Sequence, residues 1–339
     1  MVNQTKRKQI LEWAVLSLIT LLVLITSLIR VDYTFTSPGY NNNVSSFIEF
    51  DTPTPLTGSF HTTSVIHYER TTMFQYYAAK LFNHVDVNEM PPFYAYLDLE
   101  DLRVQSYLSK DDSIATSIVN AANEAGIDLD YTTYTTVYLT WSYLEPDTLE
   151  IGDHILRVND IPIDTFDFTT VSCDDTATFD ILRDKEPMTV RMSPTEIDDS
   201  CRFGISLKAF TEITEENLPY HIIETNTGGP SGGIMQALYV YSQMIETDIT
   251  KGYKIAGTGT IDLAGKAGLI RGVEQKLITA IHNDIDIFFV PHLSNENTDN
   301  YVVAKALYDT LDTDLKLVPI TSLDDAITYL SSLESSGSS

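Results

Sequence analysis

The stretch TNTGGPSGGIMQ, residues 225–236, places glycines on both sides of one serine. Apolar residues follow Ser231 at helical spacing, so a helix is expected to begin near it. A serine in this position can simply cap the first turn of the helix. It can also act as a nucleophile, because the unpaired N–H groups and the positive dipole end of a helix favour an oxyanion. We favour the nucleophile, since a cap alone does not require flanking glycines, whereas Gly229 and Gly232 would let a substrate backbone approach closely.

A candidate base for Ser231 lies in GLIRGVEQKLITAIH, residues 268–282. Lys276 lies at the border of the apolar face of a helix predicted over 273–282. Such a lysine ordinarily extends its charged end into the solvent. As a general base it must be neutral near pH 7, so burial must lower its pKa to about 7 from a reference of ~10.4. His221 is the alternative base, but it lies in a predicted strand with no third group identified to orient it, so we prefer Lys276.

The charge and the motifs of the chain limit its partners. There are 48 acidic and 21 basic residues, for a formal net charge of −27. Nucleic acid is not expected, because phosphate binding requires clustered Lys and Arg. A nucleotide is not expected either, because Gly265-Lys266 lacks both the earlier glycine of a P-loop and the Ser or Thr after the lysine. The histidines are scattered and no C-x-x-C pair occurs, so we expect no metal or other cofactor.

The N-terminus contains an apolar run over residues 10–29 in which Glu12 is the only charge, preceded by Lys6, Arg7 and Lys8. A helix of this length spans about 30 Å, the thickness of the hydrocarbon core of a bilayer. The basic residues predict a cytoplasmic N-terminus (1–9), a transmembrane signal anchor (10–30) and a body outside the cell membrane. A cleaved signal peptide is the alternative, but the run exceeds the usual ~7–15 residues and no A-x-A-like site follows.

The segment 31–130 is predicted to be a linker and an N-terminal α/β segment that could belong to the same fold as residues 196–331. Its expected features are a linker over 37–46, a strand over 58–69, a helix over 72–82, and a helix over 111–126 capped by Asp112 or Ser113.

Residues 131–195 consist of short β-rich runs separated by turn formers. LEIGDHILRVNDIPI (149–163) resembles the hallmark of PDZ domains, in which a Gly-Asp turn leads into a strand and then a second turn, here Asn159-Asp160. TFDILRDKEPMTVRMS (178–193) predicts a closing hairpin. The resemblance implies that this domain binds an extended peptide at a sheet edge. A small β-domain without that function is the alternative.

Two cysteines occur, Cys173 and Cys201. In an exported protein they could form a disulfide, and closing that loop would contribute ~3–4 kcal/mol. Free buried cysteines are the alternative.

Residues 196–331 alternate short strands with helices, which predicts an α+β domain, and 332–339 form a low-complexity tail that is expected to be disordered. The predicted strands are GISLKAF, YHIIET, GYKIAGTGTID, DIFFVPH and LKLVPI, and the predicted helices cover 234–245, 273–282, 302–311 and 323–330.

Three motifs follow one another in this domain: GGPSGG (228–233), KGYKIAGTGTID (251–262) and GLIRGVEQK (268–276). Together they resemble the proteolytic domain of Lon peptidases, which use a Ser-Lys dyad. The resemblance assigns the nucleophile to Ser231 and the general base to Lys276, and it adds Thr258 as an active-site threonine. Two residues depart from the family pattern. Gly232 stands where alanine is usual, and Arg271 stands where glycine is usual, close enough to lower the pKa of the lysine or narrow the cleft.

Nearly the whole chain resembles the membrane-anchored, PDZ-containing Lon-like serine proteases of Gram-positive bacteria, which lack the ATPase module of Lon. The expected fold class is α+β: a Lon-type proteolytic domain with a PDZ-like β-rich domain, preceded by one transmembrane helix. The expected function is ATP-independent cleavage of exported peptides or of membrane and secreted proteins, with the PDZ-like domain aiding substrate recognition. The alternative is a proteolytically inactive, membrane-tethered PDZ scaffold.

Overall fold

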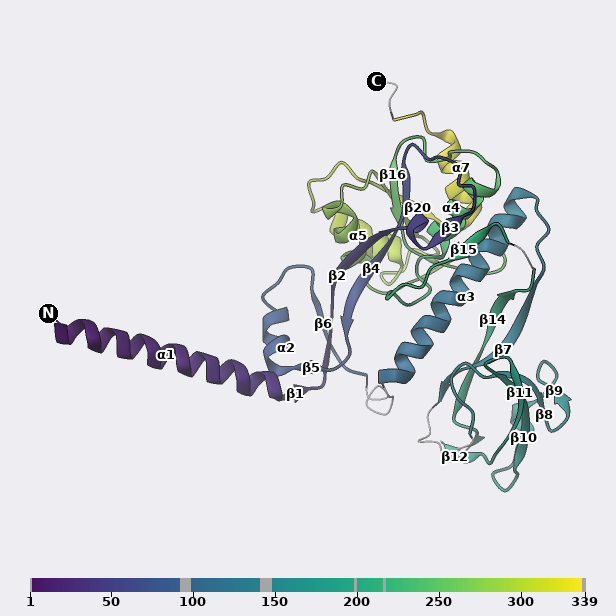
Figure 1. Cartoon of the computed structure of the whole chain (residues 1–339), viewed down its shortest axis with the longest axis horizontal. Helices are drawn as coiled ribbons and strands as arrows, with labels where there is room; N and C mark the ends of the chain where they lie inside the picture. Colours follow the sequence, from purple (N-terminus) through teal and green to yellow (C-terminus); the bar gives the residue numbers. More distant parts are fainter. Residues whose placement is uncertain (1, 92–98, 141–147, 198–199, 216–217, 337–339) are drawn as a thin grey trace.

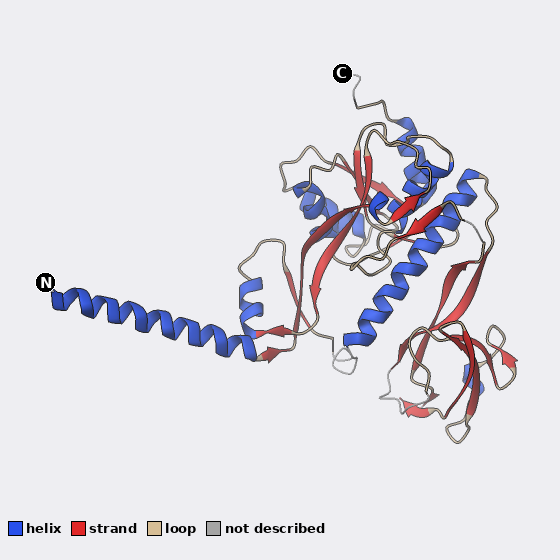
Figure 2. Cartoon of the chain, in the orientation of Figure 1, coloured by secondary structure: helices blue, strands red, loops and turns tan. Residues whose placement is uncertain are grey.

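The computed structural model describes residues 2–91, 99–140, 148–197, 200–215 and 218–336. Figure 1 shows a long N-terminal helix, a mixed α/β body, and a small β-rich unit beside the helix α3. The mixed character of the body, with helices around a central sheet, is clear in Figure 2. The last three residues of the predicted tail lie outside the described residues. Ser336 is placed by its N–H, which donates to the Lys251 carbonyl at 2.9 Å.

The N-terminal helix α1 (Val2–Leu28) projects away from the body (Figure 1). Its segment Lys6–Leu28 has a mean hydropathy of 2.2 and is exposed along its length. By length and composition it could cross a membrane. Short strands β1 (Arg30–Val31) and β5 (Thr71–Thr72) pair directly after it.

The body is built on one six-stranded sheet in the order β20-β19-β16-β4-β2-β6. Its strands are β2 (Tyr33–Asn43), β4 (Ser59–Tyr68), β6 (Asp86–Glu89), β16 (Lys254–Gly257), β19 (Ile287–Pro291) and β20 (Lys316–Ile320). β4 pairs in parallel with β16, with Phe60 opposite Ile255. The N-terminal and C-terminal parts of the chain therefore share one sheet, and the β-rich unit is inserted between them.

The prediction of a linker over 37–46 is wrong, because most of this segment lies in β2. The turn formers instead mark an irregularity, where the pairing of β2 with β4 shifts register between Pro38 and Asn41. A Cβ on Gly39 would lie 2.6 Å from the Ser64 carbonyl oxygen, so the close approach of the two strands requires glycine there.

Helices cover both faces of the sheet. Neighbouring residues of a strand point to opposite faces, so each face has its own apolar side chains that a helix layer buries. Phe289 packs with α4 (Gly233–Met244) and α7 (Leu323–Ser332), while Phe288 packs with α5 (Val273–His282) and α6 (Asn300–Tyr308). The short helix α2 (Met73–Ala79) is capped by Thr72. The remaining short elements of the body are η1 (Val44–Ser46), β3 (Ile48–Phe50), β15 (Tyr220–Ile222), β17 (Thr260–Ile261) and β18 (Ala267–Gly268).

The helix α3 (Leu99–Ala125) is longer than the sequence indicated. Its expected cap at Asp112 or Ser113 is wrong, because both residues lie in the middle of the helix. The first half is largely polar and carries no continuous apolar face that would predict it. Ile114 and Ile118 in the second half pack into the core of the body.

The β-rich unit contains a sheet in the order β11-β10-β8-β7-β14. Its strands are β7 (Tyr131–Thr140), β8 (His154–Val158), β9 (Ile161–Pro162), β10 (Ala177–Arg183), β11 (Glu186–Met192), β12 (Thr195–Ile197), β13 (Ser200–Arg202) and β14 (Ile205–Ile213). Asn159 and Asp160 form the predicted turn and have positive φ angles of 51° and 64°. β14 pairs with β7, so the unit extends past the expected boundary at residue 195.

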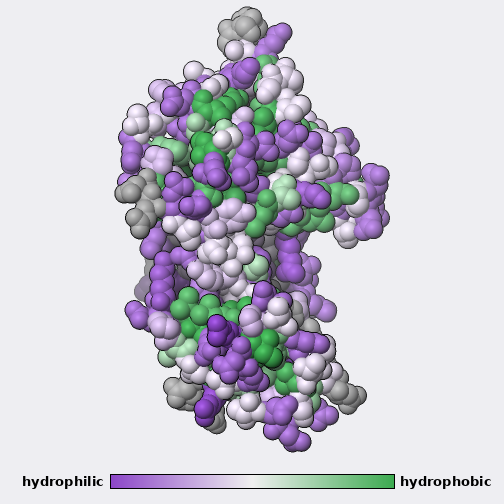
Figure 3. All heavy atoms as spheres, turned by 90° about the vertical axis from the view of Figure 1, so that its right-hand side faces the viewer, coloured by the Kyte–Doolittle hydropathy of each residue, from purple (hydrophilic) through white to green (hydrophobic). Residues whose placement is uncertain are grey.

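An apolar groove of about 620 Å³ lies beside β14, the edge strand of this sheet. Its apolar lining is Phe168, Val171, Phe203, Ile205 and Leu207. Figure 3 shows that the β-rich unit, in the lower half of that view, exposes apolar residues on this side of the molecule.

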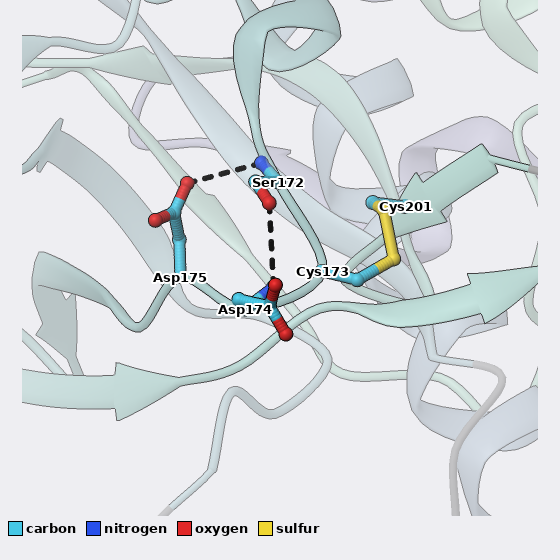
Figure 4. The surroundings of a disulfide bond; sticks show 5 residues. All are labelled: Ser172, Cys173, Asp174, Asp175 and Cys201. Atoms are coloured by element: carbon cyan, nitrogen blue, oxygen red, sulfur yellow. Dashed lines mark hydrogen bonds between the residues drawn. A yellow bond between two sulfur atoms is a disulfide. The ribbon is translucent and has the colours of Figure 1, made fainter.

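Cys173 and Cys201 form a disulfide (Figure 4). Cys173 follows the short helix η3 (Phe168–Thr170), and Cys201 lies in β13. The bond ties the loop after η3 to β13, and both segments border the apolar groove.

Candidate active site

Ser231 lies in the turn that leads into α4. Gly229 precedes it with a φ of +86°, a conformation that favours glycine. Gly232 is the N-cap residue of α4 and makes no side-chain cap bond. Ser231 is therefore not the cap of this helix, and its hydroxyl is free for other partners.

The amine of Lys276 reaches the hydroxyl of Ser231. Its Nζ lies 2.5 Å from Ser231 Oγ and 3.0 Å from Thr258 Oγ1. Lys276 is only 2% exposed, because its part of α5 is packed against the sheet. The helix begins after Gly272, which has a φ of +70° and lets the chain turn sharply into α5. The predicted placement of this lysine at the edge of an apolar face thus leads in the structure to a buried amine.

Burial lowers the pKa of Lys276 to about 7. The cause is desolvation, which disfavours the charged ammonium. Among the described residues, no carboxylate offsets this cost. Arg271 is exposed, and its charge instead contributes to lowering the pKa of His67. The neutral amine needed by a general base is therefore present near pH 7 without help from Arg271.

Thr258 connects the lysine to the backbone of the nucleophile. It follows β16 and is fully buried. Its Oγ1 accepts from Lys276 and donates to the Ser231 carbonyl at 3.2 Å. The N–H of Gly259 donates to the same carbonyl at 2.9 Å. The end of β16 thus fixes both members of the pair.

The amide groups around Ser231 differ in their availability. The N–H of Gly229 donates to the Ser106 carbonyl of α3 at 2.8 Å. Within the described parts of the chain, the N–H groups of Ser231 and Gly232 have no hydrogen-bond acceptor. Both residues line the cleft, so their N–H groups are candidate donors to a substrate oxygen.

Gly232 fits a tight position. A Cβ at this residue would lie 2.8 Å from Thr62 Cγ2 and 3.2 Å from Gln236 Nε2. Thr62 on β4 would have to move to admit the alanine that is usual in the family pattern. Glycine in place of alanine at this position therefore fits the close approach of β4.

His221 lies in β15, which pairs with β3. Its Nε2 lies 3.1 Å from Asp51 Oδ1, and its side chain is 75% exposed. Both observations favour a surface ion pair over a catalytic role.

The contribution of α3 could not be anticipated from the sequence motifs. Ser113 Oγ donates to the Pro230 carbonyl at 3.0 Å, and Ser117 Oγ donates to the Gly233 carbonyl at 2.9 Å. With Ser106 they lie on one face of the helix, at positions i, i+7 and i+11. Ser106 acts through its backbone carbonyl, so its residue type carries no signal. α3 holds residues 228–233, the nucleophile loop, from both sides of Ser231.

A cleft lies over Ser231 and is bordered by β2, β4, α3 and the nucleophile loop. Residues from these elements that line it include Asn42, Thr62, Lys110, Thr225 and Gly228. The arrangement combines a hydroxyl, a buried amine and a small cleft of about 40 Å³.

Residues 202–331 match the family model of the Lon protease (S16) C-terminal proteolytic domain. The chain is 26% identical over 130 residues to Lon protease of Neorickettsia sennetsu and 28% identical over 117 residues to Lon protease of Mesomycoplasma hyopneumoniae. These alignments cover 38% and 34% of this chain but only 14% and 13% of those proteins. The matched region contains Ser231, Thr258 and Lys276. This part of the chain is therefore similar to a Lon-type proteolytic domain.

Replacing the buried amine should stabilise the protein at neutral pH. In the unfolded chain Lys276 stays protonated up to a pKa of ~10.4, whereas the folded protein releases the proton near pH 7. The unfolded state therefore binds more protons between these values, and stability rises with pH. Lys276→Met should gain on the order of 4 kcal/mol at pH 7 and below, and the gain should shrink towards pH 10.

Calorimetric unfolding of Ser231→Ala and of Ser231→Ala/Lys276→Met across this pH range measures the effect without self-cleavage. A gain that does not change with pH would show that Lys276 carries its charge in the folded protein.

Proposed function

We propose that the protein is an ATP-independent serine endopeptidase with Ser231 as nucleophile and Lys276 as general base. The observation that carries the proposal is the 2.5 Å contact between Ser231 Oγ and a lysine amine whose pKa is lowered to about 7. A base with a pKa near the working pH is the most effective proton acceptor. Independence from ATP is part of the proposal because the chain resembles Lon-like proteases that lack the ATPase module.

In the proposed reaction, neutral Lys276 accepts the hydroxyl proton while Ser231 Oγ attacks the carbonyl carbon of the scissile peptide bond. The carbonyl oxygen becomes an oxyanion and accepts from the N–H groups of Ser231 and Gly232. The new ammonium, held by Thr258, returns its proton to the leaving amine as the C–N bond breaks. Water then attacks the acyl carbon while Lys276 again accepts a proton. The bond from this carbon to Ser231 Oγ breaks, Oγ takes the proton back from Lys276, and the acid product leaves.

Substitutions of the dyad test this mechanism. Ser231→Ala, Lys276→Ala and Lys276→Arg should each lower cleavage of a labelled unfolded protein such as casein by at least about a thousandfold. The guanidinium of the Arg variant has a pKa above ~12 and cannot accept the proton. His221→Ala is the control and should keep its activity. For the parent enzyme, kcat/KM should rise through about pH 7 and then level off, because only the neutral amine is a base.

Loss of activity in His221→Ala with retention in Lys276→Arg would instead assign a histidine mechanism. If the parent chain cleaves no peptide at all, the inactive scaffold becomes the better description.

We further propose that the β-rich unit is a PDZ-like domain that presents substrate. Support comes from its groove, where apolar side chains line the end of an edge strand to which an extended peptide could add as a further strand. Arg202 borders the same groove, and its guanidinium could bind a carboxylate by donating hydrogen bonds to it.

A charge placed in the groove tests this role. Val171→Glu should raise KM for an extended protein substrate about tenfold relative to KM for a short peptide, because desolvating the new carboxylate opposes binding of an apolar chain. Met188→Glu is the matched control, since Met188 is 44% exposed and lies on β11. If the ratio of KM for the protein substrate to KM for the short peptide is the same in both variants, the groove does not take part in substrate recognition.

We also propose that α1 anchors the protein in the cell membrane with its N-terminus in the cytoplasm and the body outside. The support is the exposed apolar surface of α1, the basic residues before it, and a disulfide of the kind that persists in oxidising compartments.

The disulfide provides the test of topology. In intact wall-stripped cells, a membrane-impermeant maleimide should label Cys173 and Cys201 only after an impermeant reductant is added. Reduced thiols that react only after the cells are lysed would place the body in the cytoplasm.

A further inference from the structure

The cleft beside Ser231 contains a cation that the proposed catalytic mechanism does not use. Lys110 lies on α3 between Ser106 and Ser113, the residues that contact Gly229 and Pro230. It lines the cleft together with Ser231. Lys110 is thus placed one helical turn from each of these two residues.

The amine of Lys110 is largely enclosed but weakly paired. Its side chain is 13% exposed. Its ion-pair partner among the described residues is Asp111, whose Oδ1 lies 3.7 Å from Nζ, longer than a hydrogen bond. The Asp111 side chain is 66% exposed, so solvent screens this pair. The amine also lies over the Tyr107 ring, 5.1 Å from its centroid. Neither contact is within hydrogen-bond distance, and an ammonium group has three donors, so Nζ can still donate to an incoming acceptor.

The charges around the cleft favour an anionic group next to Ser231. Lys110 is the one ionisable residue that lines this cleft in the described structure, apart from the nucleophile itself. An adjoining cavity of about 410 Å³ shares Lys110 and Thr225 with it and adds one further cation, Arg103, and two carboxylates, Asp111 and Glu224. The two cations and the two carboxylates of this cavity balance each other, whereas the cleft beside Ser231 carries the charge of Lys110 alone. A substrate carboxylate is therefore best accommodated at the Lys110 end, near the scissile bond.

We propose that Lys110 determines specificity by binding a carboxylate that the substrate carries close to the scissile bond. This inference rests on the proposed peptidase function and assigns one property to its substrates. The carboxylate can belong to an Asp or Glu side chain or to the free C-terminus of the peptide. A charge-assisted hydrogen bond of this kind corresponds to about a tenfold to hundredfold preference for the acidic substrate over its neutral isostere.

Matched peptides measure this preference. One Glu, or its isostere Gln, is moved along a fixed peptide sequence, and each peptide is made with a free or an amidated C-terminus. Binding constants are measured with the full chain carrying Ser231→Ala, so that no cleavage is needed. We expect the Glu peptide, or the free acid, to bind at least tenfold more tightly than its neutral counterpart at one position.

Adding Lys110→Met to the same chain should abolish that preference, and Lys110→Glu should reverse it in favour of a Lys-containing peptide. Lys316→Met is the matched control because it removes the same charge from an exposed position on β20. The source of the carboxylate is identified by which difference in binding constant disappears in Lys110→Met. Loss of the difference between the Glu and Gln peptides indicates a side chain, and loss of the difference between the free acid and the amide indicates the C-terminus.

A preference unchanged by Lys110→Met and Lys110→Glu in folded protein, or no preference in the parent chain, would overturn the proposal. Cleavage of the same peptides by the chain with Ser231 intact reports separately on the peptidase function. Charge-dependent binding without cleavage would retain the Lys110 site while rejecting the proposed enzyme.

Discussion

The contact between a buried amine and a serine hydroxyl is the constraint on which the rest of the structure depends. Burying Lys276 with no carboxylate partner costs free energy, yet without that burial the amine would stay protonated at neutral pH. The surrounding fold offsets the cost with an apolar sheet and the tight α5 packing that Gly272 permits. Thr258 then gives the amine a polar contact that carries no charge. The site is therefore unfavourable by itself and is maintained by the packing around it.

That packing draws on segments far apart in the sequence. The nucleophile loop is held by α3 on one side and by the end of β16 on the other. The sheet behind it is completed by β2 and β4 from the N-terminal part of the chain. Because β4 also supplies Thr62 to the cleft, the matched proteolytic domain of residues 202–331 does not contain its complete active-site wall.

The sequence was most informative where the signal was local. The boundaries of α5 and the roles expected for Ser231 and Lys276 came from periodicity and neighbouring glycines, and the structure brings these two residues into contact. The pairing of strands far apart in the sequence could not be predicted. Pro38 and Gly39 are turn formers in isolation, and only β4 turns their segment into a strand with a local irregularity. Likewise, β14 could be assigned to the β-rich unit only through its pairing with β7.

The same strand β2 connects the proposed anchor to the site. It begins at Tyr33, five residues after α1 ends, and it ends at Asn43, next to the cleft residue Asn42. Its 11 residues extend over about 35 Å at ~3.3 Å per residue. With α1 in a bilayer, the paired strand would hold the cleft at a distance from the membrane set by its own length and tilt. A single-span substrate would then need roughly ten extended residues outside the bilayer to reach Ser231 if the strand stands upright, and fewer if it lies flat. Because β2 is a paired strand and not a flexible linker, the fold itself would set the distance between the membrane and the cleft.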